Sequence, residues 1–310
     1  MNRFDWRNAM KKAVFATLSV ASVPVFADVS ITINDANTAT AIINLPTAAD
    51  PQYSATVTIW FDAATNLSAD SLGLTAEIVD PATFTGLPSG VNLDPNFPVL
   101  VSVEPQTAIF RNGLETNQSG DGNLSFTNSY ELELHSDEHL SCSSSSSNFR
   151  LFKAPHDSDT FTDITDDIYQ GSVRARGRGG AFSRFVIVHD TRNFSLGLIT
   201  LPIALVGKIL AVVDAINAAG ITDGTLVTEL LNFLTDVATD LLLLNVTGAI
   251  DDVNDLVADV LSHAGTDIPN FWSAASPTTD GAGQIISAAD TLNFTLSLLN
   301  GTPTCTAPPP

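Results

Sequence analysis

The apolar residues follow two different periods along the chain. Up to about Arg192 they recur at every second position: in 53–61, Tyr, Ala, Val, Ile and Phe alternate with Ser, Thr and Trp. The same alternation occurs at 39–45, 124–126 and 130–134, with Gly-containing turns at 87–90 and 120–122 between such segments. Alternation places successive side chains on opposite faces of a strand. Several short strands of this kind predict an all-β sandwich for residues 28–192.

Beyond Arg192 the apolar residues fall at helical spacing. In 250–261, Ile, Val and Leu share one face, and Asp251, Asp252, Asp255 and Asp259 fill the opposite face. A similar stripe occupies 226–241, and another helix is expected at 284–296. Thr247 is expected to cap the start of the 250–261 helix, and Gly265 to end it. The pattern predicts an all-α antiparallel helical bundle as a domain at 193–300, followed by a flexible Pro/Thr tail at 301–310.

The first residues have the features of a secretory signal peptide. Four basic residues precede an uncharged apolar stretch at 13–26, and Val25 and Ala27 are small residues at the positions that a signal peptidase reads. We therefore expect a signal peptide at 1–27 and export to the periplasm, the cell surface or the medium. No Cys follows Ala27 directly, so a lipid anchor is not expected.

Net charge restricts the classes of partner. The whole chain has a formal charge of −21, and without residues 1–27 it keeps 9 basic and 33 acidic residues, a formal charge of −24. Such a chain repels nucleic acid and anionic membranes. The apolar stretch 196–213 is about as long as a bilayer span, but Pro202, Gly207 and Lys208 interrupt it. A helix buried inside the protein is therefore expected there, and membrane insertion is not.

Two groups of short motifs resemble known modules. The segments 149–153, 161–165, 171–174 and 181–185 (FRLFK, FTDIT, GSVR and AFSRF) resemble the closing hairpin of ankyrin- and netrin-receptor-type sandwiches and of many bacterial surface domains. The stretch from 221 through 249–254 to 288–292 resembles the FIMAH-type helical module of secreted bacterial proteins. The order of the two resembles a family of uncharacterised exported proteobacterial proteins. The resemblance implies an Ig-like or ankyrin-type sandwich followed by helices, and an exported protein; it implies no particular site.

One short motif matches a class of zinc peptidases. His135-Ser136-Asp137-Glu138-His139 fits H-x-x-E-H, in which two His bind zinc and the Glu activates a water. That geometry needs a helix, because residues four apart must share one face. The residues before His135 alternate like a strand and a Ser tract follows His139. We therefore expect no zinc and no catalytic centre, and a zinc-dependent hydrolase that uses 135–139 stays the alternative.

Other candidate chemistry is sparse. The chain lacks the G-x-S-x-G elbow, the phosphate-binding P-loop and the dinucleotide fingerprint, and no cofactor is expected. Calcium is left open for the aspartates of 157–167, whereas 117–122 is expected to be a plain turn. The two cysteines are Cys142 and Cys305, and a disulfide between them is open, as are two free thiols.

Basic residues concentrate in one region and include a regular row. Arg174, Arg176 and Arg178 alternate with small or apolar residues in one predicted strand. They therefore share a face, where like charges repel unless anionic groups lie opposite. Three sources stay open: nearby aspartates of 157–167 around a solvated row, the acidic helices, and an external anion such as an acidic polysaccharide or a cell-surface protein. These three arginines are the candidate ligand-binding residues.

The function predicted from these features is that of an exported bacterial protein that binds a ligand or contributes to a surface assembly without catalysis. The ligand and the oligomeric state are not indicated by any motif.

Overall fold

The computed structural model describes residues 27–45, 53–95, 97–107, 110–111, 114–115, 123–136, 148–169, 172–192, 201–275 and 280–301. Its strands are β1 (Asp28–Asp35), β2 (Thr38–Leu45), β3 (Tyr53–Thr65), β4 (Leu74–Ile78), β5 (Val91–Leu93), β6 (Val99–Val103), β7 (Phe110–Arg111), β8 (Leu114–Glu115), β9 (Ser125–Ser136), β10 (Phe149–Ala154), β11 (Thr162–Asp163), β12 (Thr165–Ile168), β13 (Val173–Gly179), β14 (Arg184–Asp190) and β15 (Phe271–Ser273). Its helices are α1 (Ala69–Leu72), α2 (Ile203–Ala218), α3 (Gly224–Leu242), α4 (Val246–His263) and α5 (Gly281–Leu299).

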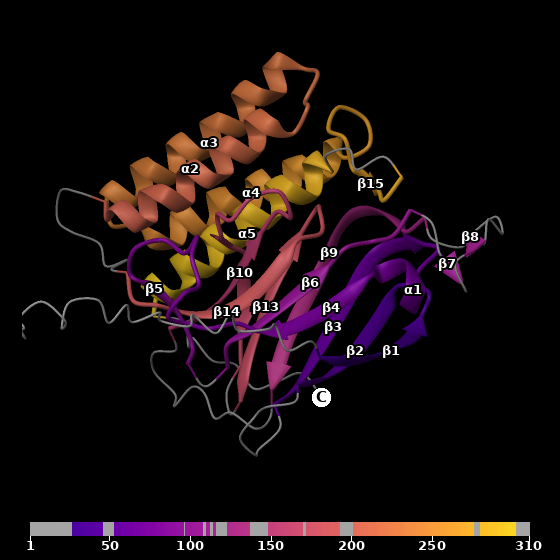
Figure 1. Ribbon diagram of the computed structural model, residues 1–310. Coiled ribbons are helices and arrows are strands. Elements are labelled where there is room, and N and C mark those ends of the chain that lie inside the picture. The colour runs from indigo at the N-terminus through magenta and orange to yellow at the C-terminus, as the bar shows by residue number, and fades with distance from the viewer. Residues whose placement is uncertain are drawn as a thin grey trace, which may run out of the picture.

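Two antiparallel sheets pack against each other over one shared core (Figure 1). One sheet has the order β1-β2-β3-β9-β13-β12, with β15 pairing on β9, and the other has the order β11-β10-β14-β6-β4, with β5 pairing on β14. Val57 and Leu132 from the first sheet meet Val101, Leu151 and Phe185 from the second in this core. The predicted strands at 39–45, 53–61 and 130–134 are confirmed, and their alternation supplies the inward-facing residues.

The helices do not form a clearly separate bundle domain, so the predicted fold class is wrong in that respect. The expected arrangement was an all-β sandwich followed by an independent all-α bundle, and a sandwich of sheets fits only in part. α5 packs against β9, β12 and β13 on one side and against α2 and α4 on the other (Figure 1). Strand β15, between α4 and α5, completes part of the first sheet, where Trp272 pairs with Phe126. The boundaries assigned at residues 27, 192 and 300 stay predictions.

The physical reason lies in the composition of α5. A helix at the surface of a bundle has one apolar stripe, whereas a helix that is apolar or small on most sides is buried on most sides. α5 buries Ile285, Ile286, Leu292 and Leu296 together with several small residues, and Phe294 packs against the core between the sheets. The predicted helix at 284–296 is thus confirmed. It packs against the sandwich as well as against the other helices.

The ends of the other helices follow local chemistry. The stripes at 226–241 and 250–261 are confirmed as α3 and α4. The predicted cap Thr247 is wrong: the side chain of Asn245 accepts a hydrogen bond from the Gly248 amide and begins α4 two residues earlier. Gly265, with a φ of 79°, follows the last turn as expected. Among the described residues no helix is both long enough and apolar enough to span a membrane.

Glycines make the contact between α5 and the sheet possible. A Cβ at Gly283 would lie 2.0 Å from the Asn128 carbonyl oxygen of the β9 strand, and one at Gly281 would lie 2.2 Å from the Ala219 carbonyl oxygen. Both distances are far shorter than a van der Waals contact, so a side chain at either glycine would push α5 away from its neighbours. Gly207 of α2 differs, because a Cβ there would have no neighbour within 4 Å.

We therefore expect Gly283→Ala and Gly207→Ala to have opposite effects on stability. Gly283→Ala should lower the free energy of unfolding by about 1–3 kcal/mol, because the overpacking outweighs the better helix propensity of Ala. Gly207→Ala should raise it by up to about 1 kcal/mol, because only the propensity changes. Urea denaturation followed by circular dichroism measures both. A Gly283→Ala protein as stable as the parent chain would show that α5 does not sit so closely on β9.

Candidate functional site

The three predicted arginines form a row on one face of β13, as expected from their alternation, and each meets carboxylates of the same chain. The Nε atom of Arg174 lies 2.8 Å from Glu133 of β9. Arg176 lies 3.4 Å from both Asp166 and Asp167 of β12. The guanidinium of Arg178 binds Glu131 of β9 and lies 3.1 Å from Asp290 of α5. We call Arg174, Arg176 and Arg178 the arginine row.

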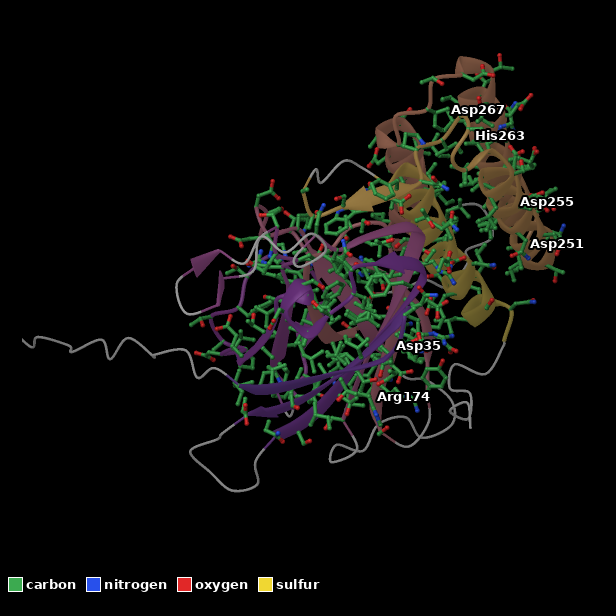
Figure 2. All side chains as sticks on the ribbon, turned by 90° about the vertical axis from the view of Figure 1, so that its right-hand side faces the viewer. Asp35, Arg174, Asp251, Asp255, His263 and Asp267 are labelled. Carbon is green, nitrogen blue, oxygen red and sulfur yellow. The ribbon has the colours of Figure 1, made fainter. Side chains whose placement is uncertain are left out.

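An aromatic ring and the helices complete the surroundings of the row. The guanidinium of Arg174 stacks over the ring of Tyr169 at 4.7 Å, and that of Arg176 lies 5.7 Å from the same ring. From the helices, Asp290 reaches the row. Asp251 and Asp255 of α4 lie on the side of the helices turned away from the sheets, far from Arg174 (Figure 2). The carboxylate partners of the arginine row come mainly from the neighbouring strands β9 and β12. Binding of an external ligand by the row stays a prediction.

Carboxylates outnumber guanidiniums around the row. The five carboxylates named above face three arginines. Apart from the row, Asp280 caps the start of α5, where its Oδ1 accepts from the Gly283 amide at 2.9 Å. Burial raises the pKa of Asp166 to about 7, with nearby Arg176 opposing the shift. Burial likewise raises the pKa of Asp290 to about 6 and that of Asp280 to about 7. Three carboxyl groups in or beside α5, those of Asp166, Asp280 and Asp290, therefore take up protons in mild acid.

The raised pKa values of these three carboxyl groups determine how the stability of the fold changes with pH. Between about pH 4 and 7 the folded chain binds more protons at these groups than the unfolded chain does, so stability falls as the pH rises through this range. Asp280→Asn keeps the cap acceptor and removes one titrating group. We expect this variant to lose less unfolding free energy between pH 5 and pH 8 than the parent chain, by up to about 2.5 kcal/mol. Urea denaturation at both pH values is the measurement.

Asp251→Asn is the matched control for that experiment, because Asp251 lies on the exposed face of α4. It should leave the difference in stability between pH 5 and pH 8 unchanged. Equal pH dependence in the parent chain and in Asp280→Asn would contradict the assignment.

The candidate zinc motif is only partly within the described residues. His135 lies near the end of strand β9, and its Nε2 is 2.9 Å from the Ser172 hydroxyl. Asp137, Glu138 and His139 lie outside the described residues, as do Cys142, Cys305 and the signal-peptide segment. The strand expected before His135 is confirmed. Within the described part of the chain, no cluster of three or more His, Cys, Asp or Glu side chains has the geometry of a metal site.

A second charged cluster lies where α2 meets the other sheet. Lys208 of α2 forms an ion pair with Asp163 of β11, and both side chains are almost fully buried. Asp163 also accepts from the Thr165 amide at 2.9 Å. Arg192 binds Asp190 through two hydrogen bonds, at 2.9 and 2.6 Å, and the Asp190 side chain is fully buried. Burial opposes ionisation of Asp163, but the charges of Lys208 and Arg150 outweigh it and lower the pKa of that carboxyl.

A groove of about 760 Å³ adjoins this cluster. Its walls are the N-terminal half of α2 and the outer face of β10, closed at one end by the turn at 88–90. Most of the lining is apolar, with Phe152, Phe161, Pro202, Ile203 and Ala211 among the residues. Arg192, Lys208 and Asp163 supply the charged groups. An apolar groove with a few polar groups at one place has the composition of a small-molecule site.

Sequence reasoning missed this site, although one signal was present. Lys208 is the only charged residue in the apolar stretch 196–213. A charge in a buried helix needs a partner in another element, so Lys208 indicates a long-range ion pair. Nothing in the sequence identifies Asp163 as that partner, because the other aspartates of 157–167 are equally suitable by residue type.

Comparison with protein-family models gives one match, which covers residues 9–300 and is described as a family of unknown function, DUF6689. The chain belongs to the DUF6689 family. Neither the curated proteins nor the solved structures give a match to this DUF6689 protein. The family match adds no evidence for the resemblance to FIMAH-type modules or to exported proteobacterial proteins.

In this DUF6689 protein, replacing one member of the buried Lys208–Asp163 pair should lower the unfolding free energy more than replacing both members. Lys208→Met leaves the Asp163 carboxylate buried without its main partner, and should cost about 3–5 kcal/mol of unfolding free energy. Combining it with Asp163→Asn keeps the acceptor for Thr165 and removes the charge, so the double variant should recover much of that loss. A double-mutant cycle in urea measures the coupling. Additive losses would show that the two side chains do not interact.

Proposed function

We propose that this DUF6689 protein is an exported, non-catalytic binding module, and that the groove beside α2 takes a small amphipathic ligand with one negative charge. The observation that carries the proposal is the composition of the groove: an apolar channel with the cationic side chains of Lys208 and Arg192 in its lining. The ligand would lay its apolar part along the groove and place its acidic group near Lys208 and Arg192.

The walls of the groove are mostly apolar. Phe152 and Phe161 form the floor on the sheet side, and both are almost completely buried. Ile203 forms part of the rim and is 92% exposed. An exposed branched residue at the rim of an apolar groove favours a ligand that covers it, because each buried CH₂ contributes about 0.8 kcal/mol.

Charged side chains lie at one end of the groove. Arg192 and Lys208 are the cations that line the groove, and they pair with Asp190 and Asp163. Two cations at one end of an apolar groove contrast with the net charge of −21 for the whole chain. Such a pair of cations suits an acidic group, and Arg192 presents a planar guanidinium that can share its donors with a carboxylate or phosphate.

Export rests on the sequence features of residues 1–27. A periplasmic or extracellular binding module meets small amphipathic acids as free solutes or as products of lipid breakdown. The proposal assigns no reaction to the groove.

The test uses decanoate, decanol and decyltrimethylammonium, which share the chain length and differ in charge. Isothermal titration calorimetry should give the tightest binding for decanoate, weaker binding for decanol and no binding for the cation. Octanoate should bind roughly tenfold more weakly than decanoate, because two CH₂ groups are worth about 1.6 kcal/mol.

Two glycine variants localise the binding. Gly207→Leu directs a side chain into the groove, where the space is open, and should abolish decanoate binding without unfolding α2. Gly224→Leu is the matched control, because Gly224 also has open space in front of it but lies in α3, away from the groove. Decanoate binding that survives Gly207→Leu, or equal binding of all three probes, would contradict the proposal.

A further inference from the structure

Residues 28–310 contain two lysines, Lys153 and Lys208, and the structure gives them opposite surroundings. Lys208 is paired with Asp163, as described above. Lys153 of β10 forms no ion pair and no hydrogen bond through its ammonium group with any described residue, and burial is the cause of its altered pKa. A buried amine without a counter-ion is costly, and it is a common feature of functional sites.

The side chain of Lys153 points to the inner face of its sheet. It lies on the same face of β10 as Phe149 and Leu151, which belong to the core between the sheets. A Cβ on Gly179 would lie 3.2 Å from the Lys153 Nζ and 2.5 Å from the Tyr130 hydroxyl. Gly179 thus leaves the space that both side chains use. The Tyr130 hydroxyl donates to the Ala181 carbonyl at 2.7 Å and orders this end of the core.

Lys153 also lines a cavity of about 490 Å³ between the sandwich and helices α2 and α5. Hydroxyl groups of Ser158, Thr160 and Ser183 and the amide of Gln284 share the lining with it. Asp163 and Lys208 line both this cavity and the groove of the proposed function, so their ion pair stands between the two spaces. Lys153 is partly exposed, so a small molecule in the cavity can reach it.

Burial lowers the pKa of Lys153 to about 8. At pH 7 roughly a tenth of such an amine is neutral, compared with well under a thousandth for an ordinary lysine. The neutral form is the nucleophile, so this amine is far more available for attack than a surface lysine.

We propose that Lys153 is a carbonyl-capturing amine, which takes a small aldehyde from the cavity and holds it as a Schiff base. The nitrogen lone pair forms a bond to the carbonyl carbon, and the carbonyl oxygen takes a proton from the nitrogen to give a carbinolamine. Loss of the hydroxyl with the second nitrogen proton releases one water and leaves the C=N bond. No oxidant, reductant or cofactor is required.

The surroundings favour a neutral carbonyl compound over a carboxylate. Asp163 and Asp214 line the cavity together with Lys153 and Lys208, so the described charges already balance and no anionic ligand is needed to balance them. An aldehyde brings no charge, and the Ser and Thr hydroxyls can donate to its oxygen during addition. The Lys153 cavity is a different space from the groove of the proposed function.

The experiment traps the Schiff base in the full chain. The protein is incubated with propanal and sodium cyanoborohydride at pH 7, and peptide mapping by mass spectrometry follows propylation of each lysine with time. Lys153 should react at least tenfold faster than Lys208 and faster than Nα-acetyl-lysine methyl ester in the same solution. The rate should rise with pH to a plateau near pH 8–9, because the amine titrates at about 8.

Lys208 is the internal control, since it is buried but paired. Lys153→Met should remove the fast label and leave the slow ones. Gly207→Leu should leave the labelling of Lys153 unchanged, which separates this test from that of the groove. Labelling of Lys153 no faster than that of the free lysine ester would overturn the proposal. Protection by propanoate at concentrations equal to those of propanal would also overturn it, because the cavity would then be an anion site.

Discussion

The ion pair between Lys208 and Asp163 joins α2 to the sandwich through two buried charges. α2 packs mainly on α5 and α3, and beside this pair it leaves open space on both sides against the sheet. Two buried charges tolerate little displacement, because separating them in a low-dielectric interior costs several kcal/mol. The pair therefore fixes the width of the groove and of the Lys153 cavity together. Both proposed sites exist because apolar packing between α2 and the sheet is incomplete and a charged contact replaces it.

A second constraint acts at α5. This helix needs apolar residues on most sides, because it is buried between the sheet and the other helices. It also needs small residues in its first turn, so that the backbone of β9 can approach. It must also accept Arg178, whose guanidinium it meets through Asp290 and whose carbonyl accepts from the Ser287 hydroxyl at 2.5 Å. Asp290 thus joins α5 electrostatically to the arginine row, and burial raises the pKa of its carboxyl group to about 6.

Much of the secondary structure could be predicted from the spacing of apolar residues along the chain alone. The strands that contain Val57 and Leu132 and the helices that contain Leu230 and Val253 follow the alternation and the helical stripes. The layer arrangement could not be predicted, because the role of α5 depends on contacts with β13 that lie far away along the chain. The start of α4 was misassigned because Asn245 and Thr247 are both good caps, and only backbone geometry at Asn245 selects between them.

The same limit applies to the candidate sites. That Arg174, Arg176 and Arg178 share a face follows from alternation, whereas their partners depend on strand register. Arg176 stands opposite Glu133 and Arg178 opposite Glu131 because β13 pairs with β9 in that register, and a shift by one residue would exchange every contact. The groove and the Lys153 cavity arise between elements that are distant in sequence, so no local pattern marks them.

Strand β15 has a consequence for the order in which the molecule can assemble. Its partner β9 lies almost half the chain earlier, as the pairing of Trp272 with Phe126 shows. The α3–α4 hairpin needs only neighbouring residues and can form early, whereas β9 gains its last partner only after residue 273 has been synthesised. Folding rates fall as the mean sequence separation of contacts grows. The first sheet is therefore complete only after the segment with β15 and α5 has joined β9 and β13.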